Sequence, residues 1–401
     1  MATFAEYLSY IITSIVGYFT VWVITKLKNR MFNKRLILFE KKSKQIDCSD
    51  LGFTPIATNY SLKKRFFRAE ALQKYYSITI PKDCVSELQK LNFLEVKLSD
   101  DNELEDYDDK ILKAFNNSDS LGGGDIIKQE SVYVSKSFIC DIEQGKLRFN
   151  KYLYGVSDVV KEKGLCKLFL YESDYFTYKV TVRLFNLLRQ KQNCYQQLCN
   201  NSYNNISKLT PFLNSIGVGG FIILNRGFGD ELVFGFRSKV SCQSGGYWHF
   251  SFDETFTHDD KTSENGMPNM EGCMLRAIEE ELGLSEEERK ICGVRDNVRL
   301  LNAGIISTTG DDNRFEFEVC GFGYIKFSKK YTFEDFCLGY RFAKDAEIET
   351  QTLDFVNIKK DLDFFLETVK KQNEISPEAY HLAKSIKLLY DLKILGDSYW
   401  Q

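Results

Sequence analysis

The stretch Arg276-Ala-Ile-Glu-Glu-Glu-Leu-Gly-Leu284 decides how the rest of the chain is interpreted. Arg276 and Glu280 are four positions apart, so on a helix they lie on one face, where opposite charges stabilise each other. Glu281 adds a second carboxylate to the same turn, and Gly283 follows where a left-handed helix end is expected. The predicted helix has an apolar side suited to packing on a sheet, made of Met274, Leu275, Ile278 and Leu282.

Two interpretations of this helix are open. In the simpler one, it is a surface helix with an acidic last turn and a glycine stop, which is a common arrangement. In the other, the carboxylates bind a divalent cation. Two carboxylates in the last turn oppose the negative end of the helix dipole. A hard cation such as Mg²⁺ relieves that cost, because it takes carboxylate oxygens.

The stretch resembles the second half of the Nudix box, Arg-Glu-(apolar)-x-Glu-Glu-x-Gly-(apolar). The matching positions are Arg276, Ile278, Glu280, Glu281, Gly283 and Leu284. The resemblance implies that Glu280 and Glu281 bind Mg²⁺ or Mn²⁺ and that Arg276 orients them. If the chain is a hydrolase, these three residues are its catalytic candidates.

The box also departs from the family pattern in two places. Ala277 stands where the family has a metal-binding glutamate, and Pro268 stands where it has another glutamate eight residues before Arg276. Metal-assisted phosphoryl chemistry needs several carboxylates around the metal. Hydrolysis is therefore expected to be weak or absent unless other acidic residues substitute, the candidates being Glu271, Asp345, Glu347 and Glu349.

The flanking segments predict an α/β/α sandwich over residues 208–401. Strand-like runs lie at 218–224, 231–237, 247–252, 298–306, 315–325 and 354–356, with a helix near 361–371 and another opened by Ser376-Pro377. A second strand that ends in Arg and a Trp before the box also resemble the family. The resemblance thus implies ligand contacts at Arg237, Trp248, Phe250 and Asp253. The loop after this segment is acidic, with Asp253, Glu254, Asp259 and Asp260.

Residues 36–207 predict a mixed α/β region whose fold the sequence does not name. Within it, Tyr175–Arg189 is expected to begin as a strand and turn into an amphipathic helix. The segment Gln190–Ser207 is rich in Asn and Gln and is expected to be a linker.

The N-terminal residues 1–35 predict a membrane anchor. Leu8–Thr25 carries no charge, and eighteen residues of helix reach roughly 27 Å, close to the thickness of a bilayer core. Basic residues follow the span and none precedes it, so the N-terminus is expected outside and the rest in the cytoplasm. The alternative is a buried core helix.

Composition limits the remaining possibilities. The chain has 401 residues, 27% charged, with a net charge of −3, so no DNA partner is expected. Eleven cysteines without metal-ligand spacing and three histidines predict a reduced, cytoplasmic body and no zinc site.

Two functions are compatible with these features, and a plain scaffolding role is the remaining possibility. The first is a nucleotide sensor, because the arrangement resembles the membrane-anchored Nudix effectors of bacterial antiphage systems that signal with cyclic oligonucleotides. That resemblance implies that a nucleotide or cyclic oligonucleotide binds, that the domains form homo-oligomers on activation, and that the bacterial inner membrane is disrupted. The second is a membrane-tethered hydrolase that cleaves a nucleoside-diphosphate-linked substrate with Mg²⁺.

Overall fold

The computed structural model describes residues 4–51, 53–62, 66–73, 78, 80–91, 123–144, 150, 152–162, 165–191, 209–237, 246–260, 268–284, 298–309, 315–326, 332–341, 343 and 350–395. The chain forms two compact units. One comprises Met1–Ile46 with Lys384–Gln401, and the other comprises Asp47–Ala383. The acidic residues Asp345, Glu347 and Glu349, and most of the predicted linker, lie outside the described residues.

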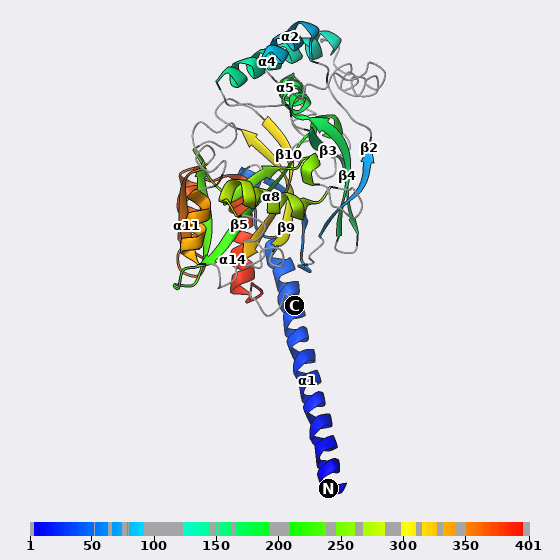
Figure 1. Cartoon of the computed structure of the whole chain (residues 1–401), viewed down its shortest axis with the longest axis vertical. Helices are drawn as coiled ribbons and strands as arrows, with labels where there is room; N and C mark the ends of the chain where they lie inside the picture. Colours follow the sequence, from blue (N-terminus) through cyan, green and yellow to red (C-terminus); the bar gives the residue numbers. More distant parts are fainter. Residues whose placement is uncertain are drawn as a thin grey trace. The chain divides into compact units, whose positions relative to one another are not determined.

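The smaller unit begins with α1, a single helix over Phe4–Ser43 (Figure 1). The predicted span Leu8–Thr25 lies inside it, and the side chains of residues 8–12 are outside the described residues. From Thr13 onward the large apolar side chains are exposed, for example Tyr18 at 78% and Val21 at 63%. Over the part of the chain that the structure describes, no helix is both long and apolar enough to cross a membrane.

The described residues of the larger unit contain an eight-stranded sheet. Its strands are β1 (Phe53–Thr58), β5 (Ile216–Asn225), β6 (Asp230–Arg237), β7 (Trp248–His249), β8 (Phe252–Thr255), β9 (Val298–Thr309), β10 (Phe315–Lys326) and β11 (Thr350–Asn357). The main order is β1-β9-β10-β5-β6-β11, while β7 pairs with β6 and β8 with β5. β10 runs parallel to β5 and antiparallel to β9. The strands predicted between residues 218 and 356 are confirmed, and the predicted 247–252 run is divided between β7 and β8.

Helices pack on both faces of this sheet. Among the described residues, the α-helices of the larger unit are α2 (Lys82–Lys90), α4 (Gly123–Glu143), α5 (Tyr175–Lys191), α8 (Met270–Leu282), α11 (Phe333–Arg341) and α13 (Leu362–Lys371). A further helix, α14 (Pro377–Asp391), begins in the larger unit and ends in the smaller one. Val218 and Ile222 of β5 share a core with α8. Phe221 points to the opposite face, because strand side chains alternate. There it contacts Phe234, which contacts Phe365 of α13 (ring centroids 4.6 Å and 4.8 Å apart).

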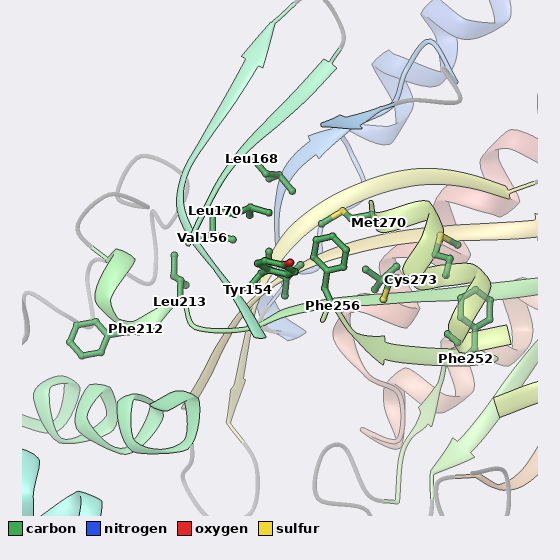
Figure 2. Close-up of a cluster of buried hydrophobic side chains, with 14 of the residues drawn as sticks. Tyr154, Val156, Leu168, Leu170, Phe212, Leu213, Phe252, Phe256, Met270 and Cys273 are labelled. Carbon is green, nitrogen blue, oxygen red and sulfur yellow. The ribbon is translucent and has the colours of Figure 1, made fainter. Parts of the chain in front are cut away.

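A second sheet of the larger unit contains three strands in the described residues, in the order β2-β4-β3. They are β2 (Phe67–Gln73), β3 (Tyr152–Glu162) and β4 (Leu165–Asp174). The core of this sheet continues into that of the larger sheet, since the Tyr154 and Phe256 rings lie 5.3 Å apart (Figure 2). Leu153 also forms a backbone bridge with Thr257. Side chains of α8, including Met270, belong to the same cluster (Figure 2).

Two parts of the region before residue 208 differ from a simple reading of the sequence. β1 lies in that region but pairs with β9 of the larger sheet. The expected strand-like start at Tyr175 is wrong, because the helix α5 already begins at Tyr175. The reason is a cap: Asp174 Oδ1 accepts a hydrogen bond from the Thr177 amide at 2.7 Å, which satisfies a free N–H of the first turn.

Candidate functional site

The helix α8 over Met270–Leu282 has defined ends. Asn269 caps its start, since its side chain accepts a hydrogen bond from the Glu271 amide at 3.1 Å. Gly283 ends it in the left-handed region, with φ of 67°. A β-carbon on Gly283 would lie 2.0 Å from the carbonyl oxygen of Gly339 in α11. The predicted helix and its glycine stop are confirmed, and the glycine also allows α11 to approach closely.

Arg276 is the centre of an ion-pair network that we call the acidic clasp, formed by Arg276, Glu254, Asp260 and Glu280. Its guanidinium meets Asp260 with two bonds of 3.0 Å. It also lies 3.1 Å from carboxylate oxygens of Glu254 and Glu280. A further bond of 2.8 Å goes to the Thr255 carbonyl. Arg276 therefore joins β8 and the turn that follows it, at Asp260, to the box helix.

The clasp is largely buried, which sets its electrostatics. The Asp260 side chain is 1% exposed and that of Arg276 is 17% exposed. Burial lowers the pKa of Arg276, but the hydrogen bonds to Asp260 and the charge of Glu254 outweigh it, so that this pKa is raised. Asp260 also accepts a hydrogen bond from the Thr257 amide at 2.8 Å. An Arg–carboxylate pair with two parallel bonds is geometrically specific, so the clasp holds one arrangement of the loop.

The two box glutamates have different partners. Glu280 pairs with Arg276, which confirms the predicted contact across four positions. Glu281 is buried, and its Oε1 accepts a hydrogen bond from the Asp253 amide at 2.8 Å. Burial raises the pKa of the nearby Tyr340, and the charge of Glu281 raises it further. Glu281 thus fastens β8 to the helix end.

The predicted ligand-binding residues fall into two groups. Arg237 and Asp253 are together, since Arg237 Nη2 lies 3.0 Å from Asp253 Oδ2. Trp248 packs instead between Phe236 and Phe365, with ring centroids 5.1 Å and 5.5 Å away.

The fourth predicted ligand residue, Phe250, is 3% exposed. Its ring centroid lies 5.4 Å from that of Phe221, which points to the α13 face of the sheet. The Arg237–Asp253 pair is thus the part of the predicted set that adjoins the box, through the amide that Glu281 binds.

The described residues do not fit the metal site that the family implies. Ala277 is 0% exposed and offers no carboxylate. Glu280 is engaged with Arg276, and Glu281 with the Asp253 amide. Among the described residues, no group of three or more His, Cys, Asp or Glu is placed to hold a metal. Glu271, a candidate substitute, sits in the first turn of α8, at the opposite end from Glu281.

Sequence reasoning missed one buried polar pair. His249 Nε2 lies 2.7 Å from Glu378 Oε1, with the two side chains 5% and 3% exposed. The two residues are 129 positions apart, so no local pattern connects them. The available signals were a histidine inside a predicted strand and a glutamate in the first turn of a predicted helix.

No family model and no curated protein matches the chain. Among solved structures it is similar to the Deinococcus radiodurans protein DR0079, with 11% identity, a TM-score of 0.26, and coverage of 43% of this chain and 82% of that one. It is also similar to MutT/Nudix family proteins from Listeria innocua (12% identity, TM-score 0.26, 45% and 97% covered) and Enterococcus faecalis (12%, 0.21, 46% and 78%). Because these scores are low, a Nudix-like assignment rests on the box and its geometry.

Proposed function

We propose that this chain is a membrane-anchored nucleotide sensor whose Nudix-like domain binds its ligand without hydrolysing it. The observation that carries the proposal is the set of contacts that the box residues make within the fold. Arg276 and Glu281, which orient and bind metal in the family, here tie residues 253–260 to α8. A box used in this way stabilises a binding domain and leaves few carboxylates for catalysis.

The Nudix-like character is supported by the local geometry. The six matching positions lie on one helix and its glycine end, and that helix packs on a mixed sheet. The pair of β10 with β5 is parallel, while β5 with β6 and β9 with β10 are antiparallel.

The Arg237–Asp253 pair is the proposed contact for the nucleotide. Arg237 is 10% exposed at its side chain and Asp253 is 24% exposed. A guanidinium is a planar donor that suits phosphate oxygens, so a phosphate would compete with Asp253 for Arg237. The acidic neighbourhood favours a ligand that forms such a directed contact over nonspecific binding of polyanions.

The helix α1 supports the anchoring part of the proposal. Exposed apolar residues over its described first half are followed by basic residues from Lys26 onward. Such a helix suits a bilayer with a cytoplasmic basic flank. One helix cannot form a pore as a monomer, so we propose that ligand binding gathers the domains and that the gathered anchors disrupt the bacterial inner membrane in antiviral defence, as in the systems that the chain resembles.

The test combines binding with turnover. Detergent-purified full-length protein is incubated with linear and cyclic nucleotides and Mg²⁺, and binding, product formation and particle mass are measured. The expected outcome is binding of one nucleotide class, an increase in mass on saturation, and no product. Product formation that Glu281→Gln abolishes would instead establish the second function, a membrane-tethered hydrolase of a nucleoside-diphosphate-linked substrate. Binding without an increase in mass would overturn the clustering step.

A further inference from the structure

The buried pair His249–Glu378 stands at the start of α14. Its Nε2···Oε1 distance is 2.7 Å, and both side chains are almost fully buried. Burying such a pair costs desolvation free energy that its mutual attraction often only balances. Stability by itself is therefore a weak reason for its presence.

The pair leaves polar capacity unused. Within the described residues, Nδ1 of His249 and Oε2 of Glu378 have no hydrogen-bond partner. Buried polar atoms without a partner are uncommon and destabilising. The carboxylate is nevertheless held in its charged form. Burial raises the pKa of Glu378, but the hydrogen bond and charge of His249, with smaller contributions from a backbone amide and Ser376, outweigh it, so this pKa lies below its usual value. The His249–Glu378 contact is therefore formed, but its two buried atoms without a partner reduce the stability that it contributes.

The backbone around the pair makes β7 a connector. On one side, Gly235 and Phe236 of β6 pair with His249 and Trp248. On the other side, the Trp248 amide donates to the Glu374 carbonyl at 2.7 Å, and the Ser376 amide donates to the Trp248 carbonyl at 3.0 Å. β7 therefore lies between β6 and the segment that leads into α14.

The segment of residues 246–253, which includes β7, is attached at both ends to the proposed ligand contact. At its start, the Arg237 amide donates to the Tyr247 carbonyl and the Gly246 amide donates to the Arg237 carbonyl, both at 3.0 Å. At its end, Asp253 holds the Arg237 side chain. A ligand that takes Arg237 away from Asp253 changes the forces on both ends of residues 246–253. The middle of that segment carries His249.

We propose that the His249–Glu378 contact is a positioning latch that couples the Arg237–Asp253 pair to helix α14. This inference rests on the proposed function for the identity of the ligand contact. α14 starts in the larger unit and ends in the unit that contains α1. In that smaller unit, Arg35 of α1 donates a hydrogen bond to the Lys393 carbonyl at 3.2 Å. The latch thus couples ligand binding to α14, whose residues from Lys384 onward belong to the unit that contains α1. It requires the ligand to favour one latch state over the other, since equal affinity shifts no equilibrium.

The test needs no ligand. Asp253→Asn weakens the Arg237 pair, and Glu378→Gln weakens the latch while keeping its size. Backbone hydrogen exchange of residues 378–383 is measured in the full-length parent, each single variant and the double variant. We expect Asp253→Asn to speed exchange in α14 about threefold or more in the parent, and to add little when Glu378→Gln is already present, because coupled residues act non-additively.

Two controls keep the result interpretable. Glu367→Gln alters a residue of α13 that accepts a hydrogen bond from Tyr380 of α14 at 3.3 Å, and it is expected to leave the effect of Asp253→Asn unchanged. His249→Gln repeats the latch test from the other partner, so that a folding defect in one variant does not decide the outcome. Additive effects, or unchanged α14 exchange in Asp253→Asn, would overturn the latch.

The outcome is independent of the nucleotide assay. Coupling without any nucleotide binding leaves the latch in place and removes the sensor proposal. Nucleotide binding without coupling removes the latch alone.

Discussion

Arg276 shows how one residue changes the meaning of a motif. In the family that the chain resembles, this arginine orients metal-binding carboxylates. Here its guanidinium holds Asp260 with two bonds and contacts Glu254 and Glu280. Ala277, fully buried beside it in sequence, offers no carboxylate. The charged groups of Arg276, Glu280 and Glu281 therefore have partners within the fold.

Removing the arginine from the clasp is expected to be costly. Arg276→Ala leaves Asp260 buried with its main cation gone, and breaking a buried pair in this way costs about 3–5 kcal/mol. The measurement is the free energy of unfolding from denaturant titration of the larger unit's transition. Glu280→Ala serves as the matched control, because Glu280 is the most exposed member of the clasp at 27% and its loss should cost about 1 kcal/mol or less. Equal effects of the two changes would contradict the central role of Asp260.

His381 gives the pH dependence a definite direction. Burial lowers its pKa from 6.5 to about 4, and its Nδ1 lies 3.2 Å from Asn302 Nδ2. In the unfolded state, His381 takes up a proton as the pH falls below 6.5. In the folded state, it does so only near pH 4. His381 therefore has no effect on the free energy of unfolding above pH 6.5. Its titration lowers that free energy as the pH drops from 6.5 toward 4, by about 3 kcal/mol in total.

The measurement is the free energy of unfolding at several pH values. His381→Gln keeps an acceptor for Asn302 but cannot titrate, so it should flatten this part of the profile. A variant that retains the parent slope between pH 6.5 and 4 would show that other groups cause it.

At the scale of elements, the end of α8 depends on one glycine. Gly283 has φ of +67°, and an added β-carbon would lie 2.0 Å from the Gly339 carbonyl oxygen. Gly283→Ala therefore strains the backbone and forces α8 and α11 apart, with an expected loss of about 2–4 kcal/mol.

Gly272 provides the matched control on the same helix. A β-carbon there meets its nearest atom at 3.7 Å, so Gly272→Ala is expected to be neutral or to stabilise by about 0.5–1 kcal/mol through helix propensity. Thermal unfolding of both variants checks the pair. If Gly283→Ala is as stable as Gly272→Ala, the close approach of α11 is not required.

At the scale of the whole molecule, the prediction concerns attachment. The charge-free Leu8–Thr25 and the exposed apolar side chains that follow from Thr13 are expected to keep the full chain in the membrane fraction after cell lysis. Deletion of residues 1–30 should move the protein to the supernatant. A matched substitution set, Lys26, Lys28 and Arg30 to Gln, should leave it in the membrane but weaken its orientation. A full chain that is found in the supernatant would exclude the anchor.

Much of the local structure was predictable from the sequence. The helix α8, its glycine end and the Arg276–Glu280 contact follow from spacing along one helix. The strands around α8 and the Ser376-Pro377 start of α14 follow from apolar runs and capping residues. These features depend on neighbours within a few positions, which is the range over which sequence patterns carry physical information.

The sequence by itself thus determined the box, its missing glutamates, the order of strands and helices after residue 208, and a charge-free N-terminal helix. Only the tertiary structure decided which charges become partners. The acidic stretch was visible as four carboxylates, but the pairing of Asp253 with Arg237, and of Glu254 and Asp260 with Arg276, depends on how β8 is laid against α8. Likewise, the His249–Glu378 contact spans 129 positions, and β1 joins a sheet formed by distant strands. The physical reason is that long-range pairs form wherever packing brings groups together in a buried place, and no periodicity along the chain records that encounter.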